Sequence, residues 1–254
     1  MKKWFGLLAV FLMSYMVFIC ATVPMTLLIS NITLPKNVNL TGVTGTLWHA
    51  KIAQVNVGTI TLQKVSADLS FMSLIALSPE LKLVFGDALL ASPEGKLTIT
   101  LSSDKVILSD TELFVAANDI VSQLTLPLPA TAQGNVTVKL ENMSLSYADN
   151  NISTLKCTHA TGELTWKGAG VIALENNVKL GNFKADINCK DNILTVIVDP
   201  KNNLGLSFNL YARINKHLSG DGYLKPGVKF PQALQGALPF LGKKDNQGRY
   251  RLRF

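Results

Sequence analysis

The chain has 254 residues, and its 24 lysine and arginine residues exceed its 17 aspartate and glutamate residues, which gives a formal net charge of +7. This length allows one all-β domain or two small ones with a proper hydrophobic core. Apart from a basic C-terminal segment, the charges are spread along the chain.

The N-terminal segment predicts a membrane anchor. Lys2 and Lys3 are followed by no charged residue before Lys36, and an apolar core runs from Trp4 to Val23. Such a core satisfies its backbone hydrogen bonds as a helix and reaches the roughly 20 residues that a membrane span requires. We therefore expect a single-pass protein with an N-terminal transmembrane helix.

The flanks of this helix predict its orientation. Positive charge beside the first span stays in the cytoplasm, so we expect residues 1–3 to be cytoplasmic, 4–24 to span the membrane, 25–39 to form a linker and 40–254 to be exported. Nucleic acid is not an expected partner of such a domain. A cleaved signal peptide is the alternative, but its apolar core would have only about 7 to 15 residues.

The exported part predicts antiparallel β-sheet with one face buried. Apolar and polar residues alternate in many short runs rich in Val, Ile, Leu and Thr, and turns of Gly, Asn, Asp or Pro separate these runs. The clearest runs are 59–62, 96–101, 135–140 and 204–210. The fold class is therefore mainly β.

Helix signals are few, and we expect one or two short helices. Asp110 is a candidate N-cap for a helix over 110–123, and Pro231 suits the first turn of a helix over 231–238. The apolar run 71–77 is ambiguous between strand and helix.

Two segments echo each other and suggest that the sheet domain is duplicated. In 45–69, Gly45 and Trp48 precede Ala-Asp-Leu, and in 162–187, Gly162 and Trp166 precede Ala-Asp-Ile. A repeated hairpin unit would give this pattern. The alternative is that a β-rich chain reuses glycine and tryptophan by chance.

The cysteines predict one disulfide. Cys20 lies in the predicted span, whereas Cys157 and Cys189 lie in the exported part. Two cysteines in an oxidising compartment most simply pair, which stabilises the fold by roughly 3 to 4 kcal/mol. A metal site would need more ligands than His159 offers nearby, so neither metal nor cofactor is expected.

The sequence offers no catalytic site. His49, His159 and His217 are isolated, and no metalloprotease helix, nucleophile elbow or phosphate-binding glycine loop is present. Catalysis requires converging nucleophiles, bases or metal ligands. We therefore predict that the chain is not an enzyme.

Two sets of residues are candidates for contacts. Arg249, Arg251 and Arg253 alternate along a C-terminal strand and are candidates for an anionic contact, although charges on an edge strand also serve to block aggregation. Trp48 and Trp166 are candidates for partner binding or for the core, which aromatic residues on alternating strands usually fill.

Several short motifs together resemble the type II secretion system protein N family. They follow the N-terminal anchor in the expected order over nearly the whole chain, and they are Leu40–Trp48, Leu126–Ala130 before Gly134, Cys157 with Gly162 and Trp166, Cys189–Asp191, and Leu241–Gly242 followed by Gly248–Tyr250. One departure is His49-Ala50, where the family more often has a small or polar residue followed by glycine.

The resemblance implies a function through contacts. It implies an inner-membrane component, largely periplasmic, of the apparatus that exports folded proteins from Gram-negative bacteria, with other secretion subunits as partners and no catalytic residues. An anchored sheet suits a scaffold or accessory role, because sheet edges pair with neighbouring strands. The alternative resemblance is to AsmA-like envelope proteins, which implies lipid held on a concave sheet; an open apolar groove would favour it.

Overall fold

The computed structural model describes most of the chain. The described residues are 2–31, 37–58, 60–87, 89, 92–122, 130–147, 155–173, 176–212 and 218–253. Most of the Leu126–Ala130 motif and His217 lie outside these residues.

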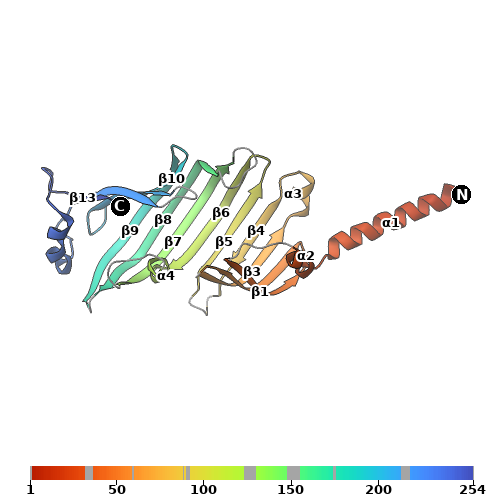
Figure 1. Ribbon diagram of the computed structural model, residues 1–254, viewed down its shortest axis with the longest axis horizontal. Coiled ribbons are helices and arrows are strands. Elements are labelled where there is room, and N and C mark those ends of the chain that lie inside the picture. The colour runs from red at the N-terminus through yellow and green to blue at the C-terminus, as the bar shows by residue number, and fades with distance from the viewer. Residues whose placement is uncertain are drawn as a thin grey trace.

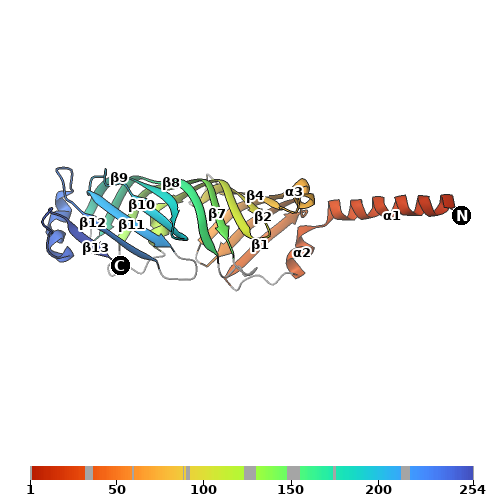
Figure 2. The same cartoon turned by 90° about the horizontal axis from the view of Figure 1, so that it is seen from above.

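Two helices open the chain. Helix α1 (Lys2–Thr22) covers most of the predicted span, and helix α2 (Met25–Asn31) lies where a linker was predicted. Figures 1 and 2 show α1 projecting from one end of the sheet, with α2 at its base. Many large apolar side chains of α1 are exposed, among them Trp4, Phe11 and Met13. No helix in the described part of the chain qualifies as long and apolar enough to cross a membrane.

The described strands form one antiparallel sheet in which each strand pairs with its neighbours in sequence. The sheet runs as a continuous meander from β1 to β13 (Figure 1). This arrangement confirms the mainly β prediction. The strands are β1 (Val38–Gly45), β2 (His49–Val57), β3 (Ile60–Leu69), β4 (Glu80–Phe85), β5 (Glu94–Leu101), β6 (Lys105–Ala116), β7 (Ala130–Ser146), β8 (Lys156–Ala173), β9 (Asn176–Lys190), β10 (Ile193–Val198), β11 (Leu206–Ala212), β12 (Ser219–Leu224) and β13 (Tyr250–Arg253).

The register aligns the alternating apolar residues on one face of the sheet. Leu83 pairs with Ala67 on one side and Leu97 on the other. Further along, Val138 lies between residues of β6 and β8 that are also apolar. Because side chains alternate between faces, this pairing carries an apolar stripe from strand to strand.

The predicted helix over 110–123 is wrong for most of its length. Residues up to Ala116 belong to β6, which pairs with both β5 and β7, and only α4 (Ala117–Val121) is helical. Asp110 is not an N-cap: it has a positive φ of 47° and lies where the register between β5 and β6 shifts. The extra residue of the bulge shifts the alternation of apolar and polar side chains by one position. The sequence pattern of β6 therefore does not look like that of a regular strand.

Two further helices were foreseen in part. Residues 71–77 resolve as α3 (Phe71–Ile75), and Pro231 caps the 3-10 helix η2 (Gln232–Leu241), which confirms a short helix there. Helix α3 lies between β3 and β4. Elements this short gain little stability from helix propensity alone, so they depend on the sheet that carries them.

The apolar face is covered in two places. Ala117 of α4 packs with Ala132 and Val136 of β7, and Leu234 of η2 packs near the C-terminal strands. All described strands belong to one sheet, and its C-terminal part curls toward the inner strands, since Leu194 of β10 and Leu206 of β11 pack against the clusters of β7 to β9. The accessible surface is 17269 Å², against about 11,000 Å² expected for a compact protein of this mass. The molecule is therefore unusually open.

The disulfide prediction is confirmed. Cys157 of β8 and Cys189 of β9 are bonded, with their Cα atoms 5.7 Å apart. The bond lies beside a small core cluster that contains Met143 and Ala160. It links two adjacent strands near the middle of the meander, and Cys20 of α1 is free.

The predicted duplication stays a prediction. Both echo segments are antiparallel hairpins of the same sheet, formed by β2 with β3 and by β8 with β9. Their registers differ, because the Trp48 carbonyl accepts a hydrogen bond from Leu69, just after Asp68, whereas Trp166 pairs with Phe183, before Asp186.

Candidate interaction surfaces

The two histidines that the structure describes, His49 and His159, lie on different hairpins of the sheet. His49, at the start of β2, pairs through Nδ1 with the carboxylate of Asp68 on β3, and both side chains are well exposed. His159 lies 3.3 Å from the hydroxyl of Thr161. Within the described residues, no group of three or more His, Cys, Asp or Glu side chains could hold a metal ion. What the structure does present is surface suited to contacts.

The three candidate arginines, in and just before the edge strand β13, have two kinds of surroundings. Arg249, just before the strand, donates from Nε to the Asp245 carboxylate at 2.8 Å, and its guanidinium lies 4.7 Å from the ring centre of Tyr223. The Arg249 backbone N–H also donates to Asp245, and these bonds lower the pKa of that carboxyl. Arg249 is therefore engaged in holding the turn before β13.

Arg251 and Arg253 are different. Both are exposed, and in the described part of the chain neither forms an ion pair. Between them lies Leu252, which packs toward the buried Tyr250 cluster. The strand thus presents two exposed cations, with Arg253 opposite Asp221 of β12, along an edge whose outer backbone groups have no strand partner among the described residues.

The opposite edge, β1, is shaped differently. Gly42 and Gly45 have positive φ angles of 67° and 89°, and helix α2 contacts this strand. The register of β1 with β2 is continuous through both glycines, and a side chain at Gly45 would collide with the His49 carbonyl. Strand β1 carries no basic strip comparable to that of β13.

The two tryptophans also differ. Trp166 of β8 is half-buried, stacks on Phe183 at 5.5 Å between ring centres, and donates from Nε1 to the Gln133 carbonyl at 2.9 Å. It packs within two of the core clusters. Trp166 thus lies with the core of the sheet.

Trp48 instead lies at a joint between α1 and the sheet, which we call the neck (residues 20–24 and 46–48). The Trp48 indole N–H donates to the Cys20 carbonyl at 2.8 Å, and the Leu47 N–H donates to the Val23 carbonyl at 3.0 Å. Pro24 and Thr46 form an isolated antiparallel bridge. Sequence reasoning missed the neck, because these contacts join segments far apart in the chain.

An exposed apolar patch lies next to the neck and was also missed. It consists of Phe71, Met72, Ile75 and Leu77 on and just after α3, which are 56, 72, 65 and 86 % exposed, and we call it the α3 patch. The Phe71 ring meets the Trp48 ring edge-on at 5.2 Å. The one sign of this patch in the sequence was the apolar run 71–77, whose pattern fitted both a helix and a strand.

One cavity lies on the apolar face. It has a volume of about 210 Å³ and is lined by Met143, Leu145, Leu155, Cys157, Asn192, Leu194 and Ala212. Ligand sites usually have volumes of about 300 to 1,000 Å³. The cavity is therefore small for a ligand, and its lining is almost entirely apolar.

Together these features define a class of protein: an open antiparallel sheet with a projecting apolar helix at one end and a basic edge strand at the other. The comparisons with known proteins identify the family within that class.

The chain belongs to the family described as type II secretion system (T2SS), protein N, whose family model matches residues 36–253. It is 29 % identical to the type II secretion system protein N of Aeromonas hydrophila over 258 residues, which covers 100 % of this chain and 98 % of the relative. It is 26 % identical to the protein of that name from Vibrio cholerae, covering 98 % and 97 %. No solved structure matches the chain. The predicted family is therefore confirmed.

Proposed function

We propose that this chain is a scaffold or accessory subunit of the type II secretion apparatus, anchored in the inner membrane by α1 and exposing its sheet to the periplasm. The observation that carries the proposal is the open edge of β13, which offers unpaired backbone groups beside Arg251 and Arg253. An extended segment of a neighbouring subunit adds to such an edge through main-chain hydrogen bonds, and the two cations select an acidic segment.

The anchor is supported by the chemistry of α1. No charged residue occurs from Trp4 to Thr22, and the large side chains described for the helix, such as Phe11 and Met13, are exposed rather than packed on the sheet. Exposed contiguous apolar surface of this size marks a contact with membrane or protein. The two lysines at the start of the helix favour a cytoplasmic N-terminus.

Lipid handling is the competing function, and the geometry gives it less support. An acyl chain would need an open apolar groove, whereas α4 and η2 cover parts of the apolar face and its described cavity is smaller than most ligand sites. The scaffold function needs only exposed edges, which the sheet provides.

Photocrosslinking in the native host tests the scaffold proposal. A benzoylphenylalanine at position 253, at the end of β13, is expected to capture another secretion subunit, and Arg251→Glu in the same chain is expected to reduce that capture several-fold. Lys184→Glu is the matched control, because Lys184 is an exposed cation on an inner strand. Capture of phospholipid or lipid-transport proteins without secretion subunits would contradict the proposal and favour lipid handling.

A further inference from the structure

The α3 patch is unusual because its exposure is combined with backbone strain. Leu77, which follows the helix, has a φ of 54° and a side chain that is 86 % exposed. The left-handed conformation disfavours a side chain by roughly 1 to 2 kcal/mol and is usually taken by glycine after a helix. Leu77 thus combines a strained backbone with an apolar side chain left almost wholly in water.

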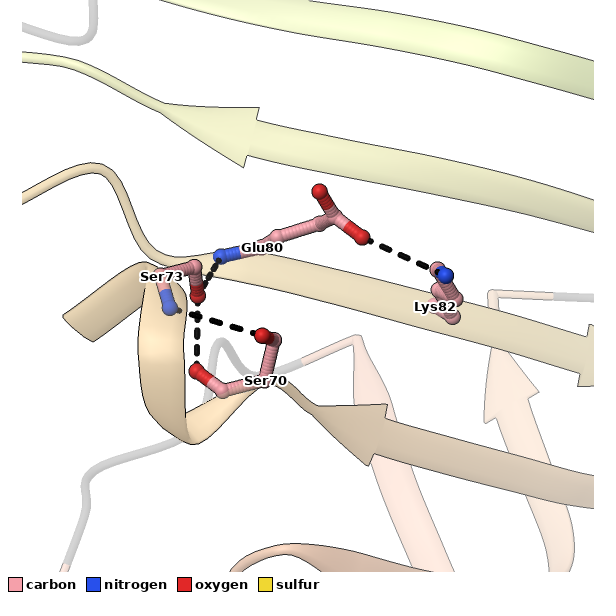
Figure 3. Close-up of polar contacts among 4 residues, drawn as sticks. All are labelled: Ser70, Ser73, Glu80 and Lys82. Atoms are coloured by element: carbon pink, nitrogen blue, oxygen red, sulfur yellow. Dashed lines mark hydrogen bonds and ion pairs between the residues drawn. The ribbon is translucent and has the colours of Figure 1, made fainter. Parts of the chain in front are cut away.

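The patch is held firmly in place. Figure 3 shows Ser70 and Ser73 at the start of α3: the Ser73 N–H donates to Ser70 Oγ at 3.4 Å, and Ser73 Oγ donates to the Ser70 carbonyl at 2.7 Å. The Glu80 N–H of β4 donates to Ser73 Oγ at 2.8 Å, and Glu80 pairs with Lys82 at 3.4 Å. These bonds tie both ends of the α3 segment to the sheet.

The patch also lies at the end of the sheet from which α1 projects. Figures 1 and 2 both place α2 and α3 beside the base of α1. Contacts in the neck fix this arrangement, since Trp48 contacts Phe71 of the patch with its ring and donates to Cys20 in the last turn of α1 with its indole N–H. The apolar surface therefore continues from α1 through Trp48 to the patch.

We propose that the α3 patch inserts into the periplasmic leaflet of the membrane that α1 crosses, as a second contact with lipid. This inference rests on the proposed anchor. The segment from Leu69 to Pro79 contains no charged residue, so lipid insertion leaves no buried charge. Tryptophan is favoured at the boundary between headgroups and acyl chains, which is the level that the neck places Trp48. Apolar side chains on a surface helix bury about 5 to 10 Å into this boundary.

The second contact has a mechanical consequence. A single helix lets the attached sheet rotate about the helix axis, whereas contacts at α1 and α3 fix its orientation. The β13 edge, at the far end of the sheet, is then held at a defined height and direction above the membrane. This arrangement would present the edge to subunits in the periplasm.

Spin labels on the full-length protein in vesicles of phosphatidylethanolamine and phosphatidylglycerol test the inference. Labels are attached in a Cys20→Ser background, with Cys157 and Cys189 bonded, through Met72→Cys in the patch, Val10→Cys in α1 and Val228→Cys. Val228 is the matched control, because it is a fully exposed apolar residue at the far end of the sheet. We expect collisions with oxygen, relative to a water-soluble nickel chelate, to be several-fold more frequent at positions 72 and 10 than at 228.

The outcomes separate this inference from the anchor. If position 10 reports lipid but position 72 reports water, the anchor stands and the α3 contact is overturned. If both positions report water, the anchor and the contact both fail. Spin–spin broadening at position 72 that grows with protein density would assign the patch to a second copy of the chain and would also overturn the lipid contact.

Discussion

The two ends of the sheet have opposite chemistry. At the N-terminal end, α1 and the α3 patch expose apolar side chains around the neck. At the C-terminal end, the five basic residues Lys243, Lys244, Arg249, Arg251 and Arg253 outnumber the two acidic residues beside them, Asp245 and Asp221. This difference underlies the proposals that lipid contacts the apolar end of the sheet and that an acidic protein segment contacts the basic end.

The largest expected effect comes from removing α1. If residues 1–22 are replaced by a cleavable signal peptide, we expect the protein to move from the membrane to the soluble periplasmic fraction, because the span of about 20 residues is lost. Fractionation followed by alkaline washing measures this. If the protein without α1 remained in the washed membranes, α1 would not be its anchor, and the difference proposed between the two ends of the sheet would be contradicted.

The disulfide sits between the two ends and should matter for the whole sheet. Replacing both Cys157 and Cys189 with serine is expected to lower the free energy of unfolding by about 3 to 4 kcal/mol, since the unfolded chain loses a constraint over a separation of 32 residues. Denaturant unfolding in detergent measures the change. Cys20→Ser is the control and should leave the stability unchanged.

The two tryptophans sharpen the comparison. Trp48→Phe removes the hydrogen bond to Cys20 and is expected to weaken the neck by about 1 kcal/mol. Hydrogen exchange at the Leu47 amide should then rise roughly fivefold, with little change in global unfolding. Trp166→Phe should instead lower the global free energy of unfolding by about 1 to 3 kcal/mol, since the half-buried Gln133 carbonyl contact is lost. An equal rise in hydrogen exchange at the Leu47 amide in both variants would contradict the assignment of Trp48 to the neck and Trp166 to the core.

Leu77→Gly separates stability from membrane contact. Glycine adopts a positive φ without strain, so the variant is expected to raise the free energy of unfolding in detergent by about 1 kcal/mol. The same variant should lower the lipid exposure of a label at position 72, because an apolar side chain is removed from the patch. Lower stability in detergent would show that Leu77 packs within the protein.

The smallest effect concerns pH at the basic end. Hydrogen bonds from Arg249 lower the pKa of Asp245 below its ordinary value of 3.8. The turn is therefore fully stabilised above that value and loses this contribution as the pH falls through the lower pKa of the folded state. The Arg249 amide resonance should shift over this acidic range, whereas Asp245→Asn should abolish the shift.

Much of the fold could be predicted because the alternation of apolar and polar residues can be recognised within one short segment of the sequence. The runs at 96–101 and 135–140 lie in β5 and β7, and the cysteine pair is bonded as expected. The helix over 110–123 was wrong because a bulge at Asp110 broke the alternation and made a strand resemble a capped helix.

The candidate surfaces were only partly predictable. The arginines of the C-terminal strand stood out by charge, but only the fold separates Arg249, held by Asp245, from the exposed Arg251. The neck joins Cys20 to Trp48, and the α3 patch depends on which side of a short helix faces outward. Contacts between distant segments of this kind leave no periodic signal in the sequence.

The most direct test of the account is photocrosslinking in the native host from positions 253 and 72 in parallel. The account predicts that position 253, at the basic end, captures a subunit of the secretion apparatus, and that position 72, at the apolar end, captures phospholipid. Capture of the same protein from both positions, or of phospholipid alone from position 253, would contradict it.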